Sequence, residues 1–99
     1  MKRFLVIYNG PPAPPDATHE GWREWFGSLG EALVEVGSSM VDGVVVRPDG
    51  STSDEATTLA GYCIVQAEDT SAAIELVRDH PLLAPGSAYT VEIFEVPRR

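Results

Sequence analysis

The sequence predicts an α+β domain of ferredoxin-like type, in which four antiparallel strands form one sheet and two helices cover one face of it. Three observations predict this fold. Four short stretches have strand character, two stretches carry apolar residues at helical spacing, and the order along the chain is β-α-β-β-α-β. A chain of 99 residues is the size of one domain with one core. We therefore expect a single domain over residues 1–99.

The first strand is expected at Phe4–Tyr8, a continuous apolar run with strong strand propensity. A proline-rich connection follows at residues 11–15, and Asp16 or Thr18 is expected to cap the first helix. Gly37 is the expected end of that helix. Its inward stripe, with Trp25 beside it, is expected to consist of His19, Trp22, Phe26, Leu29, Leu33 and Val36.

Two strands are expected in the middle of the chain. The first is Met40–Arg47, which contains a run of three valines, and it is followed by a turn at residues 47–50. Residues 51–58 are small and polar, which is typical of a loop. The next strand, Leu59–Ala67, is apolar on both faces, so we expect it to be covered on both faces.

A second helix is expected after the acidic and hydroxyl-rich segment 68–71, whose side chains can accept hydrogen bonds from the first free N–H groups of a helix. Pro81 should end this helix near Asp79 or His80. A last strand is expected at Ala88–Val96. The inward stripe of the helix is expected to contain Ala73, Leu76, Val77 and His80.

The strands beginning at Phe4, Val44 and Leu59 carry apolar residues on both faces. Two helices can cover only one face of the sheet, so the other face requires a partner. A second copy of the same sheet, related by a two-fold axis, would cover it. We therefore expect a homodimer that associates through the sheet face and closes into a dimeric α/β barrel.

Composition excludes several classes of partner. Seven basic and fifteen acidic side chains give a net charge of −8, whereas binding to nucleic acid or to an anionic membrane needs a basic surface. The apolar run Phe4–Tyr8 is too short for a signal peptide core or a membrane span. The lone cysteine, Cys63, cannot form an internal disulfide, which fits a cytoplasmic protein.

Two histidines are the candidates for acid–base chemistry. His80 is expected beside the negative end of a helix dipole, which favours its protonated form, while burial opposes protonation. His19 is expected at a helix start, where the dipole favours the neutral imidazole. Structural roles compete with both assignments, namely a residue that bonds helix-end carbonyls for His80 and a partly exposed first-turn residue for His19. The sequence does not show whether the two lie close together.

Aromatic side chains supply candidate walls for a small-molecule site. Tyr8, Trp22 and Trp25 can line a pocket, although packing in the core is the better default explanation for them. The Asp49-Gly50 pair is a common turn signal and also a candidate site residue. The sequence contains no zinc-type spacing and no nucleotide-binding glycine loop, so we expect no metal and no cofactor.

Several motifs resemble the YCII-related family of dimeric α/β-barrel proteins. They are Gly61-Tyr62, the helix that contains Ala72-Ala73, the His80-Pro81 pair, and the two segments 22–30 and 49–51, which are similar to short actinobacterial-type members. Most of this family has no established activity. Its members often carry a histidine and an aspartate in a cleft, and the resemblance implies His80 and Asp49 as their counterparts.

Two functions follow from these observations. The first is a small-molecule-binding cleft, with cofactor-independent acid–base catalysis by His80 or His19 on a small carbonyl compound. The second is a non-catalytic homodimeric module that binds or assists other molecules. A deep polar pocket around a histidine would favour the first, and a filled interior with both histidines at its rim would favour the second.

Overall fold

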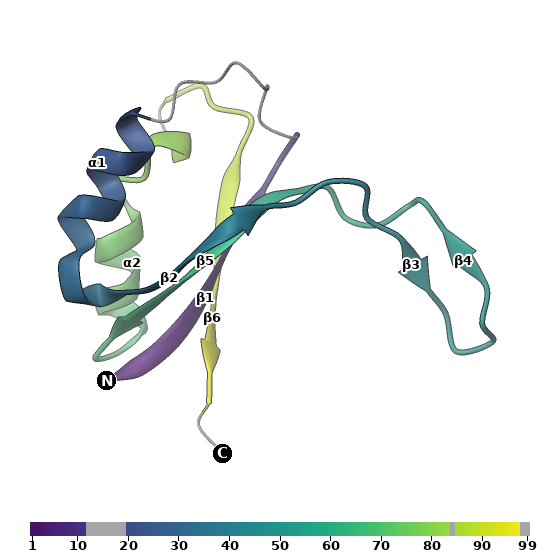
Figure 1. The fold of residues 1–99 in the computed structure, drawn as a ribbon, viewed down its shortest axis with the longest axis horizontal. Coiled ribbons are helices and arrows are strands. Elements are labelled where there is room, and N and C mark those ends of the chain that lie inside the picture. Colours follow the sequence, from purple (N-terminus) through teal and green to yellow (C-terminus); the bar gives the residue numbers. More distant parts are fainter. Residues whose placement is uncertain (12–19, 84, 98–99) are drawn as a thin grey trace.

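A computed structural model describes residues 1–11, 20–83 and 85–97 (Figure 1). It is an α+β structure with a four-stranded antiparallel sheet in the order β2-β5-β1-β6, and two helices cover one side of this sheet. The arrangement is compatible with the predicted ferredoxin-like fold. The elements of this body are β1 (Lys2–Asn9), α1 (Glu20–Leu29), η1 (Gly30–Ala32), β2 (Leu33–Ser39), β5 (Leu59–Ala67), α2 (Thr70–Val77), η2 (Pro81–Leu83) and β6 (Thr90–Val96).

The core lies between the helices and the sheet. Along β1 every second side chain points toward the helices, because successive residues of a strand face opposite sides. The register pairs Phe4 with Val65 and Val6 with Cys63 on this side, and all four side chains are fully buried. Trp25 of α1 and the inward residues of α2 close the core from above.

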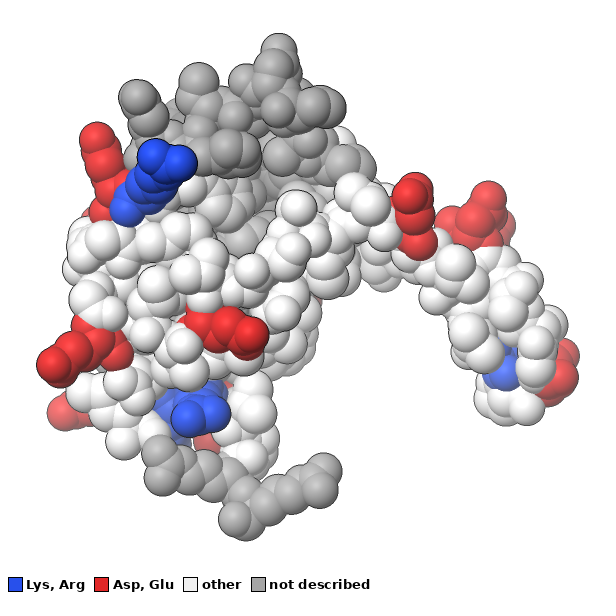
Figure 2. Space-filling view, in the orientation of Figure 1, with Lys and Arg blue, Asp and Glu red and all other residues white. Residues whose placement is uncertain are grey.

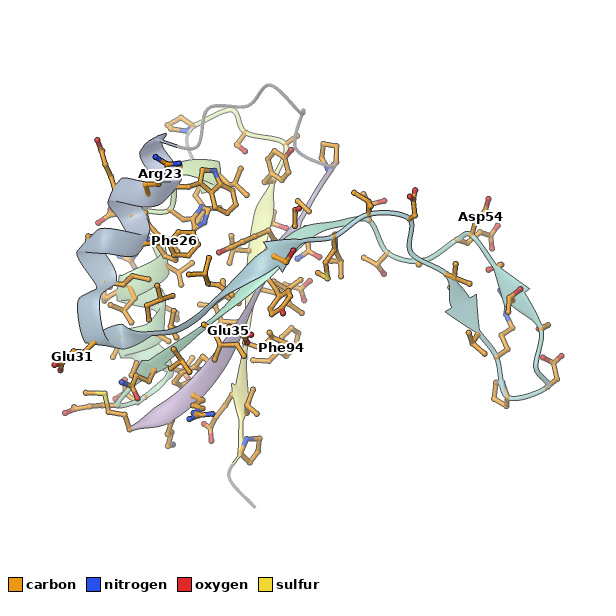
Figure 3. The ribbon with its side chains drawn as sticks, in the orientation of Figure 1. Arg23, Phe26, Glu31, Glu35, Asp54 and Phe94 are labelled. Atoms are coloured by element: carbon orange, nitrogen blue, oxygen red, sulfur yellow. The ribbon has the colours of Figure 1, made fainter. Side chains whose placement is uncertain are left out.

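Among the described residues, no helix or strand lies over the centre of the opposite side of the sheet. Leu5 is paired with Ile64 of β5 and with Phe94 of β6, and Ile7 is paired with Tyr62. Figure 3 shows Phe94 and Glu35 on this side, away from the helices, whereas Phe26 lies on the helix side. We call this surface the open face, and its apolar centre consists of Leu5, Ile7, Tyr62, Ile64 and Phe94.

The first helix is shorter than predicted. It ends at Leu29, and the expectation that it continues to Val36 is wrong. Gly30 adopts a left-handed backbone with φ of 54°, a conformation that ends α-helices and that glycine adopts without steric cost. The stretch that begins at Leu33 then pairs with β5 as strand β2. Leu29, Leu33 and Val36 fit helical spacing, but the β-branched Val34 and Val36 also favour a strand.

The second sheet strand is therefore β2, and the expectation of a strand at Met40–Arg47 is wrong for the main sheet. Residues 40–58 instead form a projecting hairpin, which we call the arm (Figure 1). Its two short strands, β3 (Val45–Val46) and β4 (Thr52–Ser53), pair only with each other. The predicted turn at residues 47–50 is present, with the Gly50 N–H donating to the Arg47 carbonyl at 2.9 Å.

The strand β5 is confirmed with the predicted bounds, and the second helix is confirmed with a slightly earlier end. Asp69 caps α2, because its side chain accepts a hydrogen bond from the Ala72 N–H at 2.8 Å. The helix ends at Val77 rather than near His80. The predicted inward stripe is present, since Ala73, Val77 and His80 are buried.

Candidate functional site

His80 lies just beyond the end of α2, where the chain turns into η2. Its side chain is 2% exposed. Its Nδ1 atom accepts a hydrogen bond from the Leu82 N–H at 3.0 Å, and its own backbone N–H donates to the Val77 carbonyl at 2.9 Å. An imidazole nitrogen that accepts a hydrogen bond carries no proton, so in the neutral ring the proton is assigned to Nε2.

Three aromatic rings surround the His80 imidazole. The ring centroids of Tyr8, Trp22 and Trp25 lie 4.6, 4.6 and 4.4 Å from that of His80. Its Nε2 atom is buried and has no hydrogen-bond partner among the described residues. A buried donor without an acceptor costs about 1–3 kcal/mol, so this N–H is the one buried side-chain group in the described part of the chain that packing alone leaves unsatisfied.

Burial determines the charge state of His80. It lowers the pKa of the imidazole from 6.5 to about 4, because the charged form loses its hydration in an apolar surrounding. The dipole at the end of α2 would favour the charged form, but burial outweighs it. His80 is therefore a neutral hydrogen-bond donor near pH 7.

The Tyr8 hydroxyl is directed toward Cys63 rather than toward His80. It donates a hydrogen bond to Cys63 Sγ at 3.0 Å. Burial raises the pKa of the Tyr8 phenol well above its usual range and also raises the pKa of the Cys63 thiol, so both stay protonated. Tyr8 therefore contributes its ring to the surroundings of His80, and Cys63 is an unreactive core thiol.

The two tryptophans hold different positions. Trp25 is 5% exposed, and its Nε1–H donates to the Leu76 carbonyl of α2 at 3.2 Å, which joins the two helices. Trp22 is half-buried and meets the His80 ring edge-to-face. Trp22 is thus the side of the aromatic cluster that is nearer to solvent.

The other sequence-predicted site residues lie elsewhere. Asp49 is in the exposed turn of the arm, where its Oδ1 atom accepts a hydrogen bond from the Ser51 N–H at 2.8 Å. Hydrogen bonds with Ser51 lower the pKa of the Asp49 carboxyl. His19 lies outside the described residues. The structure therefore brings together His80, Tyr8, Trp22 and Trp25 and does not bring Asp49 to them within one chain.

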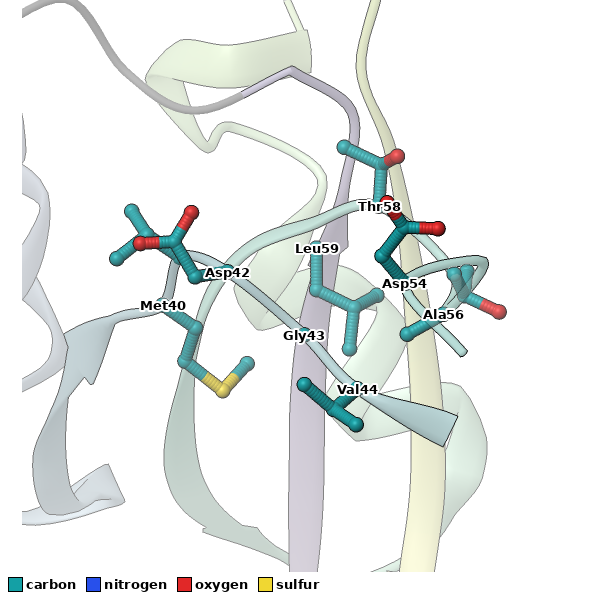
Figure 4. A pocket seen from close by; sticks show the side chains of 10 residues that line it. Met40, Asp42, Gly43, Val44, Asp54, Ala56, Thr58 and Leu59 are labelled. Atoms are coloured by element: carbon teal, nitrogen blue, oxygen red, sulfur yellow. The ribbon is translucent and has the colours of Figure 1, made fainter. Parts of the chain in front are cut away.

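A pocket of about 730 Å³ lies at the root of the arm (Figure 4). Its lining comes from residues 40–44, 54 and 56–59, on both limbs of the hairpin. The pair Asp42-Gly43, which lies inside the strand expected at Met40–Arg47, is typical of turns. Asp42 indeed has a left-handed backbone with φ of 56°.

The described residues hold no group of three or more His, Cys, Asp or Glu side chains placed to bind a metal ion. Within the same ranges, none of the helices combines the length and the apolar character that crossing a membrane requires.

Comparison with known proteins identifies one family. The model of the YCII-related domain matches residues 1–97, nearly the whole chain of 99 residues. Neither the curated proteins nor the solved structures contain a match. The resemblance drawn from the Gly61-Tyr62 and His80-Pro81 motifs is confirmed, and the chain belongs to the YCII-related family.

Proposed function

We propose that this protein is a homodimer that binds a small organic molecule at His80 and uses the neutral imidazole as a hydrogen-bond donor. The observation that supports it is the Nε2–H of His80, which is buried among three aromatic rings and has no acceptor within residues 1–11, 20–83 and 85–97. Buried donors are normally paired. A carbonyl or oxyanion oxygen of a ligand would satisfy this one.

The proposed chemistry is cofactor-independent catalysis on a small carbonyl compound, such as isomerisation or hydrolysis. A neutral N–H that is held in a low-dielectric site can polarise a carbonyl and stabilise the negative charge that develops on its oxygen. His80 is better placed to donate than to act as a base, because Nδ1 is occupied by the Leu82 N–H at 3.0 Å. A proton on Nδ1 would face the Leu82 N–H, so two hydrogen-bond donors would point at each other.

A ligand would reach His80 past Trp22. This ring is half-buried and stands edge-on to the imidazole, while Tyr8 and Trp25 are buried and hydrogen-bonded to the core. His80 is 2% exposed, so the proposal requires that the Trp22 side chain move aside when a ligand binds. The flat, apolar walls favour a ligand with a planar or aromatic part beside its acceptor oxygen.

The proposed assembly is the dimeric barrel, in which two open faces meet. Phe94 of the edge strand β6 is 49% exposed, and Leu5 and Ile7 of the neighbouring strand β1 are only half-buried. Apolar sheet faces of this kind are normally covered. A two-fold axis would bring the same five apolar side chains together from both chains.

The alternative function is a homodimeric module without catalysis, which uses the open face only to associate. The apolar surface around Phe94 favours it, since that surface requires no chemistry at His80. For this alternative the imidazole is a core residue that packs against the rings of Tyr8, Trp22 and Trp25. The two functions differ in whether a small molecule binds at His80.

For the cell, we propose a cytoplasmic protein that does not bind nucleic acid. The Cys63 thiol is free and buried, which suits a reducing compartment. The net charge of −8 opposes binding to polyphosphate surfaces.

A binding experiment tests the proposal. The native chain is titrated with a set of small aromatic ketones and carboxylates, and the ¹⁵N and ¹H resonances of the His80 ring are followed by NMR. We expect one ligand class to shift Nε2–H downfield as it gains an acceptor. His80→Phe keeps an aromatic ring but removes the donor, so it should weaken the binding of that ligand at least tenfold.

Glu75→Gln serves as the matched control. Glu75 is an exposed residue of α2 that pairs with Arg78 at 3.3 Å, so its replacement should leave ligand affinity unchanged. If no compound moves the His80 resonances, or if His80→Phe binds the ligand as tightly as the native chain, the non-catalytic module becomes the better description.

A further inference from the structure

We infer that the arm, residues 40–58, is a clasp that packs against the second copy of this chain in the dimer. The inference rests on the homodimer proposed above and adds a second contact surface to it. The arm extends from the ends of β2 and β5, and it projects away from the side of the sheet that carries the helices (Figure 1).

The arm has little to hold it in place within one chain. Its strands β3 and β4 contain two residues each and pair only with each other. An isolated two-stranded hairpin is marginal in water and becomes stable when it packs against another surface. Figure 2 shows open space between the arm and the described part of the body in this view.

The arm also exposes apolar side chains that a solvated hairpin would not need. Val41, Val44 and Val46 are 66%, 62% and 71% exposed. The charged side chains of the arm, namely Asp42, Arg47, Asp49, Asp54 and Glu55, are exposed as well. These four acids and one base give the arm a net negative charge, which argues against an anionic partner such as a membrane or nucleic acid.

The root of the arm joins the sheet close to the open face. Met40 and Leu59 line the pocket at the arm root, and the Met40 N–H donates to the Ala60 carbonyl of β5 at 3.1 Å. Tyr62 of the open face follows two residues later in the same strand. A molecule that covers the open face would therefore meet the arm and fill the hollow between them.

The exposed area agrees with a missing partner. The chain exposes 6924 Å², while a compact monomer of this mass exposes roughly 5,500 Å². The excess exceeds the roughly 800 Å² that each partner buries in a standard interface. The radius of gyration of 14.8 Å is likewise larger than the roughly 13 Å of a compact 100-residue domain.

A second copy is the occupant that these surfaces fit. Every copy carries one open face and one arm, so a two-fold axis pairs the arm of each chain with the body of the other. This isologous arrangement satisfies both unpartnered surfaces at once without any other protein.

The experiment compares dimer dissociation constants by sedimentation velocity over a range of concentrations. The double variant Val44→Ser with Val46→Ser removes apolar surface from the arm without changing its charge or its turn. We expect its dissociation constant to rise at least tenfold. Ile74→Ser is the matched control, because Ile74 is 41% exposed on α2 and faces solvent on the helix side; its dissociation constant should stay within twofold of the native value.

The arm substitutions lie outside the core, and circular dichroism checks that each variant is folded. A native dimer whose dissociation constant is unchanged by the arm substitutions contradicts the clasp and leaves the proposed dimer standing. A native chain that remains a monomer at every concentration contradicts both. If Ile74→Ser also raises the dimer dissociation constant tenfold, the clasp is contradicted, because the effect would then not depend on the arm.

Discussion

The rings of Tyr8, Trp22 and Trp25 enclose the His80 imidazole, with ring centroids 4.4 to 4.6 Å from its own. Burial among them disfavours the charged form of the imidazole, while the nearby end of α2 favours it. Burial has the larger effect, so the pKa of His80 is lowered. The helical spacing of residues 73, 76, 77 and 80 predicts that His80 is buried, but it does not predict its charge state.

The lowered pKa of His80 predicts a pH-dependent stability. The imidazole has a pKa of about 4 when folded and about 6.5 when unfolded, so between these values the unfolded chain binds more protons. The free energy of unfolding therefore falls as the pH drops below 6.5, by about 2 kcal/mol between pH 7 and pH 4.5 for this group. Urea denaturation at both pH values measures it.

His80→Phe is the comparison for this measurement, because it cannot take up the proton. Its stability is expected to fall less than that of the native chain over the same pH range, with a difference of about 2 kcal/mol. Equal pH dependence in the two proteins would show that the imidazole is not held neutral by burial.

Among the secondary-structure elements, the strands β1, β5 and β6 were predictable because their apolar patterns leave few alternatives. The segment 30–58 was not. Leu33 and Val36 satisfy helical spacing and strand propensity at once, and only the left-handed backbone at Gly30 separates the two. The valine run 44–46 has strong strand propensity, but its pairing partner is the polar Thr52–Ser53 segment rather than the main sheet.

Gly37 is the residue that allows β2 to run close to β5, and it provides a prediction about that pair of strands. It has φ of 72°, and a Cβ atom at this position would lie 2.0 Å from the Tyr62 carbonyl oxygen. Gly37→Ala is expected to lower the free energy of unfolding by about 3 kcal/mol or more, since both strain and a backbone clash oppose it.

Gly50→Ala is the matched control for Gly37→Ala. Gly50 also has a left-handed backbone, with φ of 86°, but nothing lies within 4 Å of its added Cβ. Its replacement should cost only about 1 kcal/mol of backbone strain. Similar losses in the two variants, measured by urea unfolding, would mean that the close approach of β2 and β5 is not needed.

For the whole molecule, the sequence predicted an unpartnered sheet face but could not locate it. The structure assigns it to the side that carries Leu5, Ile7 and Phe94. The structure also contains the arm, which the sequence pattern does not predict. A hairpin that packs neither face against a core has no periodic spacing of apolar residues. The candidate site was predictable only in part. The sequence indicated His80, Tyr8, Trp22 and Trp25 as candidates, but it did not show that their rings lie together.

A charge placed on the open face should separate the proposed dimer. Phe94→Glu puts a carboxylate where two apolar faces would meet, and burying such a charge without a partner is costly. We expect the dimer dissociation constant to rise at least 100-fold in sedimentation velocity. Ile74→Glu on the outer side of α2 should leave it unchanged, and a Phe94→Glu protein that dimerises like the native chain would exclude the sheet face as the interface.

The proposed function depends on a neutral His80 ring whose Nε2–H is a hydrogen-bond donor, and a single NMR spectrum tests this protonation state. A long-range ¹H–¹⁵N NMR spectrum of the imidazole rings at pH 5.5 reports the protonation of both nitrogens of each histidine. For His80 we expect a neutral ring with the proton on Nε2 and an unprotonated Nδ1 that accepts the Leu82 N–H. A ring that is protonated on both nitrogens at this pH, or a neutral ring with its proton on Nδ1, would contradict the site proposed here.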